Sequence, residues 1–103
     1  MDKWIDENKK RIINDLSDFI KIKSIQTSSK KNKPFGGGVS KALDYIMEYA
    51  EDLGLETTNL DNYIGYADWG DGDEILGILC HIDIVPPGSG WDTDPYTLVE
   101  KED

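Results

Sequence analysis

The chain holds a single histidine, His81, and an aspartate, Asp83, follows it two residues later in the stretch GILCHIDIVPPGSGWD. An imidazole can bind a metal through one ring nitrogen while its other N–H donates to a carboxylate. The pair could therefore supply one metal ligand and the acid that orients it. The structural alternative is a buried, hydrogen-bonded histidine beside a capping aspartate. The bare pair favours that alternative, because two residues are too few to be specific.

The run from Ile75 to Val85 should position this pair. It is almost continuously apolar, which is typical of a strand that is covered on both faces. Side chains two apart on a strand point to the same face, so His81 and Asp83 should project together. A Pro-Gly loop follows, and ligand crevices form at such strand ends in α/β sheets. Cys80 should point the opposite way, which favours a buried structural cysteine over a nucleophile paired with the histidine.

Hydrophobic spacing defines the other elements. Apolar residues three and four apart predict two helices, and the first carries a stripe expected to pack in the core: Ile5, Ile12, Leu16 and Phe19. A polar, glycine-ending loop separates the helices. The expected elements are helices over 4–22 and 39–53, then strands over 55–60, 62–69, 75–85 and from residue 96 onward. The predicted fold class is α/β, with two helices followed by about four strands of a mixed sheet.

Other residues with chemical potential give weaker signals. Gly36–Gly38 precede a predicted helix and could cradle an anion, but the Lys-Ser/Thr of a phosphate loop is missing, which favours a plain loop. The acids between Asp68 and Glu74 lack the spacing of a calcium loop. Asp92 and Asp94 are expected in turns.

Charge and composition limit the partners. The net charge is -10, which argues against nucleic acid and against an anionic membrane surface. A solvated acidic surface explains the charge, and so would an acidic half that faces a metal or a basic surface. A single cysteine cannot form an internal disulfide, which favours a reducing compartment. The first residues lack the apolar core of a signal peptide, so we expect a cytoplasmic protein.

The longer stretch is far more specific than the pair. It resembles the first metal motif of the aminoacylase and bacterial dipeptidase family of zinc peptidases, His-x-Asp-Val-Val-Pro followed by Gly, a spacer and Gly-Trp. Ile84 replaces the usual valine, and Cys80 stands where glycine is common. DFIKIKSIQT (18–27) resembles the family's first helix and the serine-containing turn after it. Residues 33–70 resemble the corresponding segment of its dipeptidase branch, which includes Xaa-His and β-alanyl dipeptidases. The matching motif residues are His81, Asp83, Pro86, Gly88, Gly90 and Trp91.

The resemblance implies roles for two residues. His81 would be a metal ligand in a site for two zinc ions, with manganese or cobalt as substitutes. Asp83 would be the catalytic-site acid that orients the imidazole. The implied reaction is hydrolysis of a dipeptide by a water between the metals. The family's remaining ligands and its general base have no counterpart among the 103 residues.

The whole chain, residues 1–103, is accordingly expected to be the N-terminal part of a metallopeptidase catalytic domain and to be inactive alone. A catalytic zinc usually needs three protein ligands, and this chain offers one. Exposed strands should make it self-associate. The alternative is a small non-catalytic binding module, or a pseudogene product, that pairs its strands with another chain.

Overall fold

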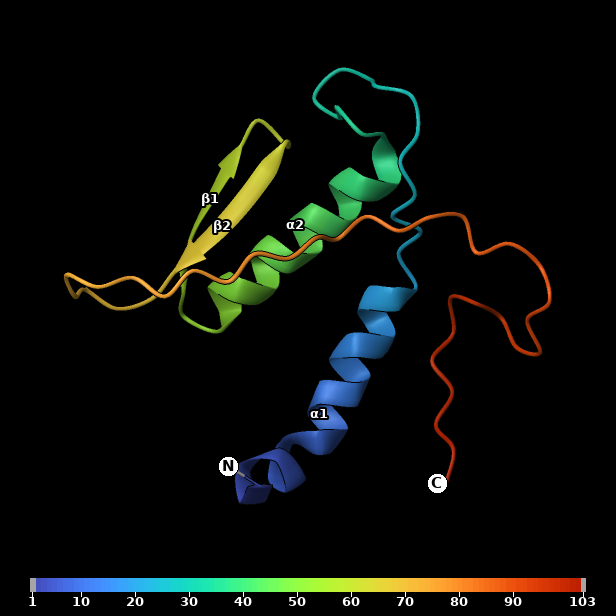
Figure 1. Ribbon diagram of the computed structural model, residues 1–103, viewed down its shortest axis with the longest axis horizontal. Helices are drawn as coiled ribbons and strands as arrows, with labels where there is room; N and C mark the ends of the chain where they lie inside the picture. The colour runs from blue at the N-terminus through green and yellow to red at the C-terminus, as the bar shows by residue number, and fades with distance from the viewer. Residues whose placement is uncertain (1, 103) are drawn as a thin grey trace.

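Two helices are followed by one β-hairpin in the computed structural model, which describes residues 2–102 (Figure 1). Helix α1 spans Asp2–Ile20 and helix α2 spans Gly37–Asp52. Strands β1, Glu56–Leu60, and β2, Ile64–Asp68, pair antiparallel, with Glu56 opposite Asp68 and Leu60 opposite Ile64. These elements confirm the two predicted helices and the first two predicted strands, with ends that differ by one or two residues.

The small core lies where α2 packs against the hairpin. Its buried apolar residues are Val39, Ala42 and Leu43, all on one face of α2. Gly65 in β2 allows the close approach, since a Cβ there would lie 2.7 Å from the Met47 sulfur. Phe35 adds an edge-to-face contact with Tyr63, with ring centroids 5.6 Å apart. The helix and hairpin therefore form the best-packed part of the chain.

Helix α1 docks on α2 through tyrosines rather than through an apolar stripe. The Tyr45 hydroxyl donates to the Asp15 carbonyl at 3.0 Å, and the Tyr49 hydroxyl donates to the Asp15 carboxylate at 2.9 Å. Phe19 stacks on Tyr45 with ring centroids 5.4 Å apart. The prediction that the α1 stripe is core was wrong, because no described residue of α1 is buried and Ile5, Ile12 and Leu16 are exposed. Within residues 2–102, no second layer covers that face.

The polar loop between the helices has hydrogen bonds of its own. Thr27 donates its backbone N–H to Phe35 at 3.0 Å, and Lys30 and Lys33 exchange backbone hydrogen bonds at 3.0 Å. The Asn62 amide donates to the Asn32 carbonyl at 2.7 Å, which ties the loop to the turn of the hairpin. The loop is therefore held by its own backbone hydrogen bonds and is attached to the β1–β2 turn through Asn62.

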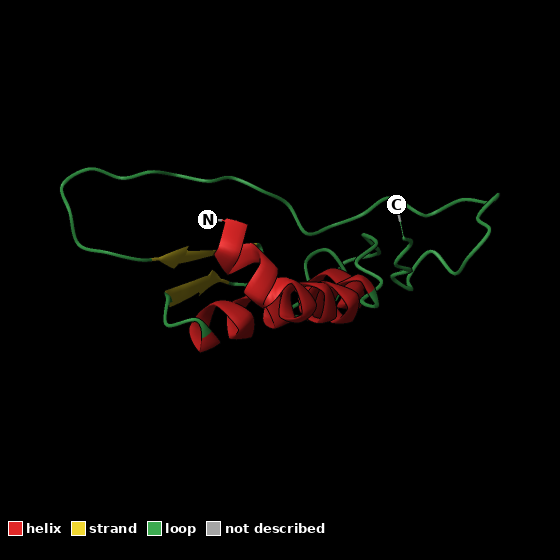
Figure 2. Cartoon of the chain, turned by 90° about the horizontal axis from the view of Figure 1, so that it is seen from below, coloured by secondary structure: helices red, strands yellow, loops and turns green. Residues whose placement is uncertain are grey.

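The prediction of about four strands was wrong: the described residues form one two-stranded sheet. The run 75–85, expected as a buried central strand, is extended chain that does not join the sheet (Figure 1), and Figure 2 shows the chain after β2 running apart from the helices. Ile75 is 92% exposed and Leu79 is 93% exposed. Its one ladder contact is an isolated parallel bridge between Ile25 and Ile84. Residues 96–102, the last predicted strand, also have no regular structure. A strand needs neighbours for its backbone groups, and residues 2–102 supply too few.

The dimensions agree with this open arrangement. The radius of gyration is 16.1 Å, whereas a compact chain of this length has about 13 Å. The accessible surface is 8853 Å², against about 5,800 Å² for a folded monomer of this mass. Among residues 2–102, neither helix combines the length and apolar character needed to cross a membrane.

Candidate metal-ligand pair

The segment with the pair is held to the rest of the fold just beside Asp83. The Ser24 hydroxyl donates to the Ile82 carbonyl at 2.7 Å, and the Ile84 N–H donates to the Ser24 carbonyl at 3.1 Å. Further along, the Trp91 indole N–H donates to the Pro87 carbonyl at 2.8 Å, which closes the Pro-Gly loop on itself. The anchored backbone groups therefore flank Asp83, and the loop with its internal hydrogen bond follows the pair.

The His81 ring faces two oxygens of Asp83. Its Nδ1 lies 3.2 Å from the carboxylate Oδ1 and 3.0 Å from the backbone carbonyl oxygen of the same residue. A carbonyl and an ionised carboxylate only accept hydrogen bonds, so this geometry requires the hydrogen on Nδ1. The lone pair of a neutral ring is then on Nε2, the nitrogen that remains free to bind a metal.

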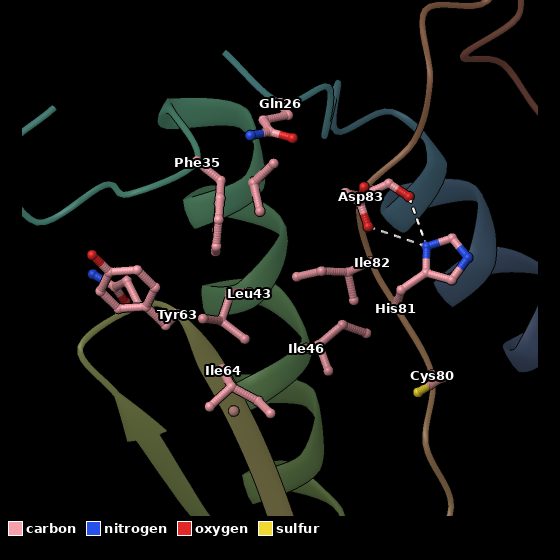
Figure 3. Close-up of a pocket in the computed structure, with 13 residues that line it drawn as sticks. Gln26, Phe35, Leu43, Ile46, Tyr63, Ile64, Cys80, His81, Ile82 and Asp83 are labelled. Atoms are coloured by element: carbon pink, nitrogen blue, oxygen red, sulfur yellow. Dashed lines mark hydrogen bonds and ion pairs between the residues drawn. The ribbon is translucent and has the colours of Figure 1, made fainter. Parts of the chain in front are cut away.

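The residues of the segment alternate about the backbone as the strand rule requires. Ile82 points toward Leu43 and Ile46 on α2, while the His81 ring and the Asp83 carboxylate lie on the other side (Figure 3). A cavity of about 380 Å³ lies between the segment, α2 and β2. Its apolar lining includes Val39, Leu43 and Ile46 of α2, and residues 80–83 of the segment line it as well. The predicted same-face arrangement of His81 and Asp83 is therefore present.

The pair is not buried, although the prediction of a strand covered on both faces would bury it. The His81 side chain is 83% exposed and the Asp83 side chain is 56% exposed. The alternative of a histidine satisfied inside the core was therefore wrong for this structure. Cys80 leaves the segment on the side opposite the His81 ring, as predicted, but it is exposed rather than buried (Figure 3). Among residues 2–102 no neighbouring strand covers the segment, which explains why His81, Asp83 and Cys80 are all exposed.

The other candidate residues do not join the pair. Asp94 accepts a hydrogen bond from the Tyr96 N–H at 2.7 Å, which confirms the predicted turn. Within residues 2–102, no group of three or more His, Cys, Asp and Glu side chains could hold a metal ion. Gly38 faces the Lys23 carbonyl, where a Cβ would overlap the oxygen, so this glycine serves close packing. The residue that sequence reasoning missed is Ser24, whose only signal was a serine in the turn after the first helix.

The chain is homologous to the N-terminal region of bacterial proteins described as putative dipeptidases. It is 44% identical over 91 residues to the "Putative dipeptidase YtjP" of Bacillus subtilis, an alignment that covers 86% of this chain and 20% of that protein.

Two staphylococcal relatives give the same result. A putative dipeptidase of Staphylococcus haemolyticus is 41% identical over 101 residues, which is 96% of this chain and 22% of the relative. One of Staphylococcus aureus is 43% identical over 95 residues, which is 90% of this chain and 20% of the relative. No family model matches the chain. The chain thus spans about a fifth of the length of the curated relatives it matches.

The donor set of the pair fits part of a zinc site. A neutral imidazole with a free Nε2 is a common zinc ligand, and a carboxylate on its other nitrogen is the usual partner of such a ligand. One ligand falls short of the three that a catalytic zinc usually takes from protein. The described residues therefore fit one ligand position and its support.

Proposed function

We propose that this chain is the N-terminal part of the catalytic domain of a zinc-dependent dipeptidase. His81 would bind one of two zinc ions through Nε2, and Asp83 would hold the imidazole in the required orientation. The observation that carries the proposal is the contact between the His81 Nδ1 and the Asp83 carboxylate, at 3.2 Å, in a chain homologous to putative dipeptidases.

Each residue of the pair has a distinct task in this proposal. Asp83 accepts the Nδ1 hydrogen, which fixes the tautomer and the orientation of the ring. His81 then offers Nε2 as a neutral donor that needs no deprotonation. Zinc, when bound, would polarise the peptide carbonyl and lower the pKa of the attacking water. The other ligands, the general base and the groups that select the dipeptide would come from the remaining four-fifths of a protein of the relatives' length.

A chimera tests the ligand role of His81. The chain would replace the homologous region of the Bacillus subtilis relative, and zinc affinity would be measured by competition with a chromogenic chelator. We expect His81→Ala to weaken zinc binding by at least about 100-fold and Asp83→Asn by about 10- to 100-fold, since the loss of an orienting partner alone costs that much.

Cys80→Ala is the matched control, because Cys80 is adjacent in sequence but leaves the segment on the opposite side. It should bind zinc like the parent chimera. Equal zinc affinity in the parent and in His81→Ala would contradict the proposed role, provided that both proteins elute as folded species of the same size.

We expect the protein to act in the cytoplasm.

A further inference from the structure

Two hydrogen bonds fix the backbone on either side of Asp83. The Ser24 hydroxyl donates to the carbonyl of Ile82 at 2.7 Å, and the Ser24 carbonyl accepts from the N–H of Ile84 at 3.1 Å. Both come from one residue, and the parallel bridge between Ile25 and Ile84 continues the contact. Ser24 therefore hydrogen-bonds to both residues that flank Asp83.

Ser24 is itself well placed to act as an anchor. It is 4% exposed, and its N–H donates to the Ile22 carbonyl at 2.9 Å. The preceding peptide lies against the first turn of α2, where Gly38 leaves room for the Lys23 carbonyl that any Cβ would overlap. The end of α1 and the start of α2 thus fix the position of Ser24.

The segment has little else to hold it. Within residues 2–102, the two bonds to Ser24 are the hydrogen bonds that join residues 75–85 to the helices, the hairpin and the loop between the helices. The residues before the pair are almost fully exposed, as Ile75 and Leu79 illustrate. The direction in which Asp83 presents its carboxylate is therefore set at Ser24.

We propose that Ser24 is a positioning residue for the metal-ligand pair. By fixing the peptides on both sides of Asp83, it holds the carboxylate against the His81 Nδ1 and so keeps Nε2 free for a metal. This inference rests on the proposed function, because positioning by Ser24 matters only if the pair binds a metal. Ser24 touches neither substrate nor metal in this scheme.

The tautomer of His81 provides the test. His81 is the only histidine of the chain, so long-range ¹H–¹⁵N spectra of the ¹⁵N-labelled 103-residue protein report it without ambiguity. At about pH 8.5, where an ordinary imidazole is neutral, the parent should show hydrogen on Nδ1. Ser24→Ala should lower the Nδ1–H population at least about two-fold and speed amide exchange at Ile84 by about five-fold, the effect of one ordinary hydrogen bond.

Two further variants separate positioning from folding. Ser40→Ala is the control, because Ser40 is also buried but, among the described residues, its hydroxyl gives no hydrogen bond to the segment. Ser40→Ala should have the Nδ1–H population and the Ile84 amide exchange rate of the parent. Ser24→Thr keeps the hydroxyl and should restore both signals. If Ser24→Ala loses the amide signals of α2 and β2, Ser24→Cys replaces it, since a thiol of similar size is a weak donor.

The outcomes are distinct. Loss of the Nδ1–H tautomer in Ser24→Ala, with recovery in Ser24→Thr, supports the inference. A parent-like tautomer in a folded Ser24→Ala overturns it and leaves the proposed function intact. A parent chain without a preference for Nδ1–H would show that Asp83 does not hold His81, which removes the basis of both.

Discussion

At the scale of single residues, hydrogen-bond direction decides what His81 can do. Two acceptors face its Nδ1, so the ring is set up to donate there and to accept or bind metal at Nε2. The same logic applies at Asp15, whose carboxylate accepts the Tyr49 hydroxyl at 2.9 Å. At His81 the two acceptors select the tautomer, whereas at Asp15 the carboxylate favours the protonated hydroxyl of Tyr49.

The contact at Asp15 makes helix docking sensitive to alkaline pH. The hydrogen bond to Asp15 is the main cause that raises the pKa of Tyr49, and burial adds to it. The unfolded chain therefore loses this proton first, so the stabilisation is complete below about pH 10 and falls as the pH rises through the folded pKa. Tyr49→Phe should lower the free energy of unfolding by about 1 kcal/mol at pH 8 and weaken its fall above pH 10.

Urea unfolding followed by helix ellipticity at several pH values checks this prediction. Tyr63→Phe is the matched control: it removes a hydroxyl from an exposed tyrosine and keeps the ring contact with Phe35. That variant should retain the stability and pH dependence of the parent. A Tyr49→Phe protein with parent-like stability at pH 8 would show that the Asp15 contact contributes nothing.

The residues of the site differ in how far the sequence could predict them. The spacing of His81 and Asp83 placed them on one side of the backbone, because alternation depends only on local extended geometry. The exposure of Cys80 and His81 could not be predicted from an apolar run, since burial depends on neighbours distant in sequence. Ser24 was missed for the same reason, because its partner Ile82 lies far along the chain.

At the scale of elements, local periodicity was sufficient for both helices and the hairpin. Helix α2 carries its apolar residues on one face and buries them against a hairpin that follows directly. The segment 75–85 is different, because its strand character needs partners on both edges. Its exposed backbone groups and apolar side chains can pair with another strand.

We expect this segment to drive self-association of the isolated chain. Pairing of two copies would cover Ile78 and its neighbours, and burial of one such side chain contributes about 1.5–3 kcal/mol. Ile78→Lys should therefore weaken the dimerisation constant by about ten-fold or more, measured by sedimentation equilibrium. Val99→Lys is the control, because Val99 is also exposed but lies outside the segment. A parent chain that stays monomeric over a wide concentration range would contradict this expectation.

At the scale of the whole molecule, the open shape and the comparisons lead to one account. The radius of gyration is 16.1 Å, and the chain spans about a fifth of the length of its relatives. We expect the rest of a dipeptidase-length protein to cover the segment 75–85 and to complete the metal site around His81. The isolated chain should then hydrolyse no dipeptide, even with added zinc, manganese or cobalt, because the described residues offer no cluster of ligands.

Dipeptide turnover by the chimera with the Bacillus subtilis relative tests the central claim most directly. With zinc at saturating concentration, the chimera and its Cys80→Ala variant should hydrolyse dipeptides, and the His81→Ala variant should lose at least about 1,000-fold in kcat/KM, the loss of about 4 kcal/mol of transition-state stabilisation. Turnover by His81→Ala at the rate of the Cys80→Ala control would contradict the assignment of His81 as a metal ligand of a dipeptidase site.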